Sequence, residues 1–198
     1  MKRPVVYAFI DSQNLNLGVC SLGWRMDYKK LRLYLKNKYN VEQAFMFIGL
    51  VANNQKLYTE LQKAGFVLIF KPTVRYFENG KETVKGNVDA ELVLHAAAIQ
   101  YPHYDQAIII SGDGDFACLV AFLVDNNKLL HVFAPNHTYS KLLAPFAGYI
   151  VHLDQLRTIL EYKKRRDRRS VETLGLPGHD DTKMIPKQGR QVKPGGKQ

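Results

Sequence analysis

The sequence predicts an α/β fold in which helices cover both faces of a mainly parallel central sheet. Short apolar runs alternate with helical patterns along the first 162 residues, and this alternation is typical of parallel sheets. The apolar runs are nearly continuous, as in strands that are buried on both sides. Of the 198 residues, 46% are hydrophobic and 23% are charged, which is normal for a globular protein and excludes a wholly disordered chain.

The strands are predicted from these apolar runs. The first run, Val5 to Ile10, ends at Asp11. The predicted strands are residues 5–10, 44–50, 66–70, 107–110, 129–133 and 149–151. Residues 73–84 predict a β-hairpin, because Asn79-Gly80 lies between two β-prone segments.

The helices are predicted from apolar residues that recur at helical spacing. The predicted helices are residues 27–35, 54–64, 88–100, 116–124, 139–143 and 154–162. Asp27 is suited to cap the N-terminus of the first of these helices. Gly65 is suited to end the second.

The positive charge is concentrated at the C-terminal end. The chain has a net charge of +10, and residues 163–198 hold 11 of its 28 basic and 4 of its 18 acidic residues. This segment has too little apolar content to offset the entropy of ordering. We therefore expect a globular domain of residues 1–162 and a disordered basic tail of residues 163–198. Such a tail attracts polyanions, although a purely solubilising role is equally compatible with it.

The remaining composition favours a cytoplasmic protein. No apolar stretch approaches the ~20 residues that a membrane span needs, so we expect no membrane association. The first residues lack the apolar region of a secretory signal. Cys20 and Cys118 are the only cysteines, which is too few for a disulfide framework or a thiolate zinc site.

Acidic residues follow the predicted strands at the edge where open α/β sheets bind ligands. Asp11 ends the first strand, Asp113 and Asp115 follow the fourth, and Asp89 opens a helix. If the first and fourth strands are neighbours, these carboxylates converge on one crevice. Each aspartate alone also fits a helix cap or a first-turn position, so only their common location favours a site.

A divalent cation would relieve the repulsion between such carboxylates. Oxygen ligands without a Cys/His cluster favour Mg²⁺ or Mn²⁺ over Zn²⁺. The chemistry that follows is metal-assisted attack of water on a phosphodiester.

Three segments of the chain resemble the NYN-domain proteins, a branch of the PIN-like ribonuclease superfamily that includes the LabA-like group. The matching segments are Asp11-x-x-Asn14, Lys85-Gly86-Asn87-Val88-Asp89 and Ser111-Gly112-Asp113-Gly114-Asp115-Phe116. They occur in the family's order within residues 4–155. The resemblance implies a PIN-like three-layer α/β/α fold, a metal-dependent nuclease site, an RNA substrate and a homodimer.

Roles for individual residues follow from the same resemblance. Asp11, Asp89 and Asp113 would be the primary metal ligands, and Asp115 a ligand or a supporting acid. Asn14 would orient the first loop or a water, and Ser111 would hydrogen-bond within the site or contact phosphate. The chain departs from the family at Asn87, which is an extra residue, and at His95, which stands where many members carry another acid.

Substrate contacts are expected on the hairpin, where Arg75 and Lys85 would hold phosphates and Tyr76 and Phe77 would stack on unpaired bases. The alternative is a hairpin whose aromatic side chains pack on the domain. Further candidate contacts are Trp24, Arg25, His137 and Tyr139.

The main functional hypothesis is a Mg²⁺- or Mn²⁺-dependent ribonuclease that acts on single-stranded RNA. The alternative is an RNA-binding or regulatory module with the same fold and weak cleavage, which the His95 departure motivates. A third hypothesis is a phosphatase with Asp11 as nucleophile. That class would place a second aspartate where this chain has Gln13.

Overall fold

The computed structural model describes residues 3–163 except 52, 72–73, 79–80 and 86–87, and for residues 74–78, 81–85 and 88 it describes the backbone only. At the centre of this region lies a six-stranded sheet in which all neighbouring strands are parallel. The strand order is β3 (Val67–Lys71), β2 (Val41–Gly49), β1 (Val6–Asp11), β6 (Gln106–Ile110), β7 (Leu129–Ala134) and β8 (Ile150–His152). The predicted parallel α/β fold is therefore confirmed.

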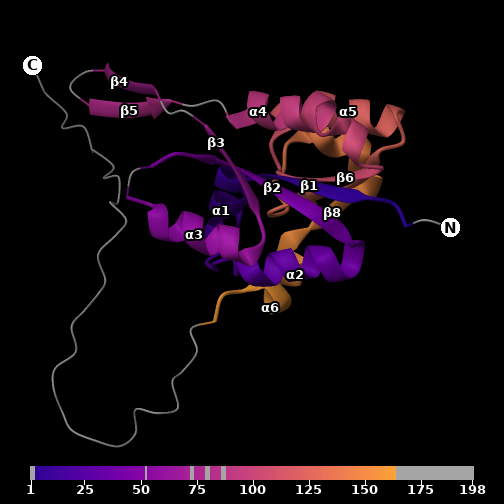
Figure 1. Cartoon of the computed structure of the whole chain (residues 1–198), viewed down its shortest axis with the longest axis horizontal. Helices are drawn as coiled ribbons and strands as arrows, with labels where there is room; N and C mark the ends of the chain where they lie inside the picture. Colours follow the sequence, from indigo (N-terminus) through magenta and orange to yellow (C-terminus); the bar gives the residue numbers. More distant parts are fainter. Residues whose placement is uncertain (1–2, 52, 72–73, 79–80, 86–87, 164–198) are drawn as a thin grey trace, which may run out of the picture. The chain divides into compact units, whose positions relative to one another are not determined.

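Helices cover both faces of this sheet, and Figure 1 shows α4 and α5 on one side and α2, α3 and α6 on the other. The α-helices are α1 (Ser12–Ser21), α2 (Tyr28–Tyr39), α3 (Gln55–Ala64), α4 (Val88–Leu94), α5 (Ala117–Asp125) and α6 (Arg157–Leu160). Shorter helical segments are η1 (His95–Ile99), η2 (Tyr101–His103), η3 (Gly114–Phe116), η4 (Lys141–Tyr149) and η5 (Leu153–Leu156).

The central strand β1 is fully buried because its two sets of alternating side chains enter two different cores. Ala8 and Ile10 pack into a cluster with side chains of α1, α2 and α3. Phe9 packs into a second cluster with side chains of α4 and α5. Burying each such large side chain contributes about 1.5–3 kcal/mol. This arrangement explains why the strand is one uninterrupted apolar run.

The sheet reverses its strand order next to β1. The chain moves from β1 to β2 and β3 in one direction, and from β6 to β7 and β8 in the other, with β1 and β6 paired in parallel. The crevice at the carboxyl ends of two such strands is where open α/β sheets bind ligands. The condition for bringing the aspartates together is thus met.

The first helix was not predicted from the sequence. The structure has α1 at residues where two asparagines and Gly18 lower the intrinsic helix propensity. Leu15 and Val19 are buried on its inner face, and Asp11 caps its N-terminus. Gly18 is required by packing, because an added Cβ atom would lie 2.4 Å from Cβ of Pro135.

The helix predicted over residues 88–100 changes character partway. It is α-helical to Leu94 and continues as the π-helical turn η1, with the amide of Gln100 donating to the carbonyl of His95 at 2.8 Å. The hydroxyl of Tyr104 donates to the carbonyl of Ala96 at 2.6 Å. This contact from a residue outside the helix satisfies a backbone group within the turn, which helix propensity does not predict.

Other predicted elements are confirmed with shifted ends. Asp27 caps α2, and Gly65 ends α3 with a φ of 96°. The final predicted helix is shorter and splits into η5 and α6, while the helix predicted at residues 139–143 is the kinked 3₁₀ segment η4. Among the described residues, no helix has the length and apolarity needed to cross a membrane.

The predicted hairpin is present as β4 (Val74–Glu78) paired antiparallel with β5 (Lys81–Lys85). Its turn, Asn79-Gly80, lies outside the described residues. Of the predicted basic tail, residues 163–198, all but Lys163 also lie outside them, so its predicted disorder and the division of the chain after residue 162 stay predictions.

Candidate functional site

The candidate site begins at the carboxyl ends of β1 and β6. Asp11 is the last residue of β1, and Ser111 directly follows β6. Both residues are buried: 5% of the surface of Asp11 and 1% of that of Ser111 is exposed. The hydroxyl of Ser111 donates to Oδ2 of Asp11 at 3.4 Å. Buried polar residues in a fold of this kind need partners, and here the partners link the ends of two neighbouring strands.

Asp11 combines a structural contact with an unfavourable electrostatic position. Its Oδ1 atom accepts the backbone amides of Gln13 and Asn14 at 3.1 and 3.0 Å, which caps α1. Burial nevertheless raises the pKa of Asp11, and the charges of Asp89 and Asp113 raise it further, against the two amide hydrogen bonds. The same carboxylate therefore caps α1 and belongs to the candidate site.

The loop after β6 is held by a chain of hydrogen bonds. The amide of Asp113 donates to Oγ of Ser111 at 3.2 Å, and the amide of Asp115 donates to Oδ1 of Asp113 at 3.1 Å. Asp113 thereby caps η3. Its carboxylate stays partly accessible, and Asp115 is exposed.

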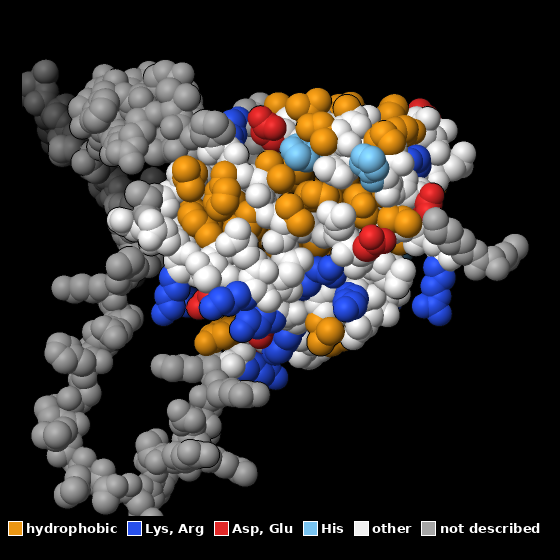
Figure 2. All heavy atoms as spheres, in the orientation of Figure 1, with side chains coloured by type: hydrophobic (Ala, Val, Ile, Leu, Met, Phe, Trp, Pro, Cys, Tyr) orange, Lys and Arg blue, Asp and Glu red, His pale blue; other side chains and the backbone are white. Residues whose placement is uncertain are grey.

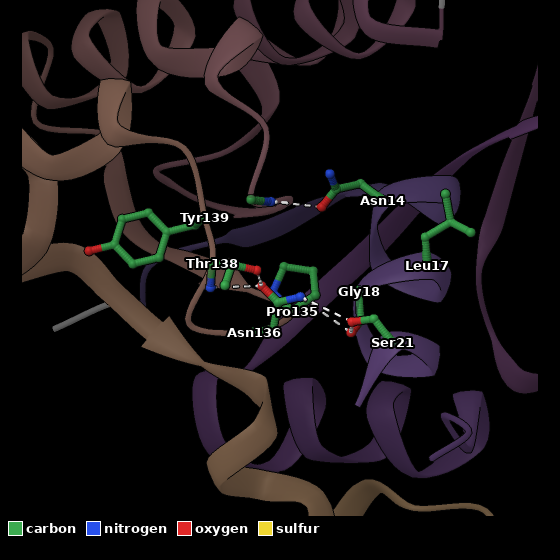
Figure 3. Close-up of a pocket in the computed structure, with 9 residues that line it drawn as sticks. Asn14, Leu17, Gly18, Ser21, Pro135, Asn136, Thr138 and Tyr139 are labelled. Carbon is green, nitrogen blue, oxygen red and sulfur yellow. Dashed lines mark hydrogen bonds between the residues drawn. The ribbon is translucent and has the colours of Figure 1, made fainter. Parts of the chain in front are cut away.

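Asn14 connects this loop to α1. Its Oδ1 atom accepts the amide of Gly112 at 2.8 Å, which Figure 3 shows as the dashed line from Asn14 toward the neighbouring loop. Asn14 was predicted to orient the first loop or a water, whereas the loop that it holds through this bond is the one after β6.

Asp89 approaches from the opposite layer, in the first turn of α4. Burial raises its pKa, the charges of Asp113 and Asp115 raise it further, and Lys71 lowers it. The charge of Asp89 in turn raises the pKa of Asp11. Four carboxylates from three separate segments of the chain thus interact electrostatically at one edge of the sheet.

This donor set fits a hard divalent cation. All of the donors are oxygen atoms, and repulsion among the carboxylates is the kind that a cation relieves. Within the described residues, these aspartates do not include three whose oxygen atoms all lie within 4.8 Å of one another. The spacing is looser than that of three direct ligands of one ion, so a cation here would be held in part through its water ligands, several of which Mg²⁺ usually keeps.

Other predicted contact residues divide into three groups. Arg75 and Lys85 lie in β4 and at the end of β5, but their side chains, like those of Tyr76 and Phe77, lie outside the described residues. The prediction that Trp24 contacts RNA was wrong, because this residue is only 3% exposed and belongs to the core. Arg25 is exposed, whereas His137 and Tyr139 lie near His152.

His95 packs against aromatic side chains. Its ring centroid lies 5.3 Å from that of Phe47 and 6.3 Å from that of Phe45. The ring of His95 is therefore part of the packing between α4–η1 and β2. The histidine ring fits here because it packs against the rings of Phe45 and Phe47, which an acid at this place would also face.

A pocket of about 260 Å³ adjoins the site and was not predicted. Figure 3 shows its walls, which come from α1 and from the loop after β7. It is lined by Asn14, Leu17, Gly18, Ser21, Gly112, Pro135, Asn136, Thr138 and Tyr139. None of these side chains is an acid or a base, so the sequence carried no charge pattern that could have indicated the pocket.

A basic helix was also missed. Figure 2 shows Lys and Arg side chains gathered in the part of the view where α2 and α6 lie in Figure 1. Helix α2 has no acidic residue and five basic ones, Lys29, Lys30, Arg32, Lys36 and Lys38. Arg32 is occupied structurally, since its guanidinium donates to three backbone carbonyls, but Lys29, Lys36 and Lys38 are exposed.

Comparisons with known proteins identify the family of the domain. The family model of the NYN domain matches residues 5–154. The chain is 23% identical over 164 residues to the low amplitude and bright protein LabA of Synechococcus elongatus, covering 79% of this chain and 88% of that protein.

A solved structure shares the fold. The crystal structure of VPA0982, a protein of unknown function from Vibrio parahaemolyticus, matches with a TM-score of 0.67 at 24% identity. The match covers 81% of this chain and 99% of that chain. Because the NYN model spans most of the chain, including all four aspartates and the loop after β6, the protein belongs to the NYN-domain family, a PIN-like family of nucleases.

Proposed function

We propose that this protein is a divalent-metal-dependent ribonuclease that hydrolyses phosphodiester bonds in single-stranded RNA. The observation that carries the proposal is that Asp11 and Asp113 follow the paired strands β1 and β6 and are linked through Ser111, with Asp89 close enough for its charge to raise the pKa of Asp11. NYN nucleases generally use divalent metals, and the domain generally implies an RNA substrate. The oxygen-only donor set supports Mg²⁺ or Mn²⁺ as the metal.

In this proposal Asp11, Asp89 and Asp113 hold the cation, and Asp115 supports them from the exposed side. The cation, when bound, supplies a Lewis acid that activates water and neutralises charge developing on the phosphodiester. Ser111 and Asn14 keep the loop after β6 in register with β1 through their hydrogen bonds. Their effect is to keep the carboxylates in place before substrate arrives.

Substrate binding is assigned to basic and neutral surfaces around the acids. Arg75 and Lys85 are proposed to hold backbone phosphates, with the exposed lysines of α2 and the basic tail adding affinity that is independent of sequence. The uncharged pocket beside Asn14 suits an unpaired base better than a phosphate. A homodimer is proposed from the family resemblance alone.

One observation favours a second candidate function, an RNA-binding or regulatory module that cleaves poorly. Within the described residues the aspartate oxygens are not gathered as tightly as three ligands within 4.8 Å. His95 supplies no further carboxylate to the site, and its ring packs on Phe47. A site that holds metal weakly would keep RNA binding while losing turnover.

The test measures cleavage and binding on the same full-length protein. A labelled single-stranded RNA is incubated with Mg²⁺, Mn²⁺ or EDTA, and binding is measured in EDTA. Asp113→Asn keeps an oxygen that can accept the amide of Asp115 but removes the charge. We expect it to lower metal-dependent cleavage at least about 100-fold, which corresponds to about 2.7 kcal/mol of transition-state stabilisation, with RNA affinity retained.

Glu60→Gln is the matched control, because Glu60 is an exposed acid on α3. It should cleave like the wild type. RNA binding without any metal-dependent cleavage by the wild type would favour the binding module. Release of phosphate from small phosphomonoesters with RNA left intact would favour a phosphatase.

A further inference from the structure

A second cluster of metal-ligating side chains lies two strands away from β6, around β8. His137 comes from the loop after β7, His152 is the last residue of β8, and Asp154 lies in η5. Each offers a ligand atom, and these atoms all lie within 4.8 Å of one another. Among the described residues this is the only such set of three His, Cys, Asp or Glu side chains.

The contacts within the cluster leave two buried polar atoms without a hydrogen-bond partner. Nε2 of His137 lies 2.6 Å from Oδ2 of Asp154, and the rings of His137 and His152 lie 4.3 Å apart. Nδ1 of His152 and Oδ1 of Asp154 are buried, and neither has a hydrogen-bond partner. A plain ion pair between His137 and Asp154 explains neither the inclusion of His152 nor these two buried atoms, because unpaired buried polar atoms are costly.

We propose that His137, His152 and Asp154 bind a divalent transition metal, of which Zn²⁺ is the ion that fits best. Two imidazoles and one carboxylate are a ligand set that Zn²⁺ and its neighbours prefer, whereas Mg²⁺ prefers oxygen ligands only. The site differs from the aspartate group both in chemistry and in place, and it does not depend on the ribonuclease proposal.

The approach of a metal to this cluster is open from one side. The side chain of His137 is 60% exposed, while that of Asp154 is 18% exposed. A metal would replace the contact between Nε2 of His137 and Oδ2 of Asp154, since metal ligands bind deprotonated. Three protein ligands leave one position of a tetrahedral shell for water or an external ligand.

The metal would join three separate elements of the chain. It would tie the loop after β7 to the end of β8 and to η5. That loop carries Asn136, Thr138 and Tyr139, which line the pocket beside Asn14, and the ring of Tyr139 lies 5.7 Å from that of His152. A bound transition metal would therefore fix one wall of the pocket.

The test is isothermal titration of the full-length, metal-free protein with ZnCl₂, followed by Co²⁺ titration monitored by visible absorption. We expect one equivalent of Zn²⁺ that persists in the Asp11→Asn/Asp113→Asn double variant, which disables the carboxylate group. His137→Ala and His152→Ala should weaken this equivalent more than about 100-fold, because loss of an outer partner of a ligand alone costs about 10–100-fold. Nitrogen-ligated Co²⁺ should give an absorption band that these two variants lose.

Matched controls use histidines outside the cluster. His103→Ala removes an exposed histidine of η2, and His179→Ala removes the histidine of the tail; both should bind Zn²⁺ like the wild type. At a free Zn²⁺ concentration 100 times Kd, the melting temperature should rise by roughly 5–10 °C. Circular dichroism checks that the variants fold, and His137→Ala is the safer of the two because its side chain is largely exposed.

Two results would overturn the proposal. One is a wild-type protein that binds no Zn²⁺ at micromolar concentration. The other is Zn²⁺ binding that His137→Ala and His152→Ala leave unchanged, or that only Asp11→Asn/Asp113→Asn abolishes. Either result would leave the cluster as an ion pair with a stacked histidine.

Discussion

Asp11 provides the sharpest test of the link between the fold and the site, because two substitutions separate its two roles. Asp11→Asn removes the charge but keeps an oxygen that can accept the amides of Gln13 and Asn14, and asparagine is as good an N-cap as aspartate. Asp11→Ala removes both the charge and the cap. Loss of an N-cap costs about 0.5–2 kcal/mol, so Asp11→Ala should melt roughly 1–8 °C below Asp11→Asn in a domain of this size.

The sign of the charge effect follows from the raised pKa of Asp11. A carboxyl group whose pKa is higher in the folded state than in the unfolded state, where it is about 3.9, binds its proton more tightly when folded. Stability is therefore lost as the pH rises from about 4 through the folded pKa. In EDTA at pH 7, Asp11→Asn should be at least as stable as the wild type, and its advantage should vanish near pH 4.

The assay is thermal unfolding of the wild type and both variants from pH 4 to 8, with EDTA and then with Mg²⁺. Mg²⁺ should stabilise the wild type in a saturable way and leave Asp11→Asn unchanged, because a ligand that binds only the folded state stabilises it. If Asp11→Asn melts below the wild type in EDTA by the same amount at every pH, the carboxylate is not under electrostatic strain and the reasoning is wrong.

Three further substitutions test the surroundings of the site. Gly114→Ala should lower the free energy of unfolding by about 1–3 kcal/mol in urea, because the new Cβ atom would lie 2.3 Å from Oγ of Ser140; unchanged stability would show that this contact relaxes freely. Trp24→Ala should cost about 3–5 kcal/mol in the same assay, since the side chain is core, and the folded fraction should keep its RNA affinity; weaker binding would restore Trp24 as a contact. Asn14→Ala leaves the amide of Gly112 without its acceptor, so we expect the free energy of unfolding to fall by about 1 kcal/mol. In steady-state cleavage, kcat should fall by a larger factor than KM rises. An effect confined to KM would make Asn14 a substrate contact only.

The sheet was the most predictable part of the fold, and the reason is local. Strand β1 is buried on both faces, so its sequence is one apolar run that needs no long-range information to recognise. The order of the strands is different, because nothing within residues 5–10 or 107–110 shows that β1 pairs with β6. The convergence of the aspartates was for that reason stated as a condition.

Features that depend on tertiary packing could not be predicted from the sequence. Helix α1 contains Gly18 because Pro135, more than a hundred residues away, occupies the space of a side chain. The π-helical turn η1 is supported by the hydroxyl of Tyr104. The uncharged pocket and the cluster around His152 are assembled from segments whose residues are unremarkable one by one, and His137 was considered only as a substrate contact.

The central claim is that Asp11, Asp89 and Asp113 together hold one divalent cation, and anomalous diffraction from crystals of the full chain soaked in Mn²⁺ tests it most directly. We predict a manganese peak among the carboxylate oxygens of these three residues that is absent in crystals of Asp113→Asn. Manganese found only at His137, His152 and Asp154, or none at the aspartates in crystals of protein that still cleaves RNA with Mn²⁺, would contradict the claim.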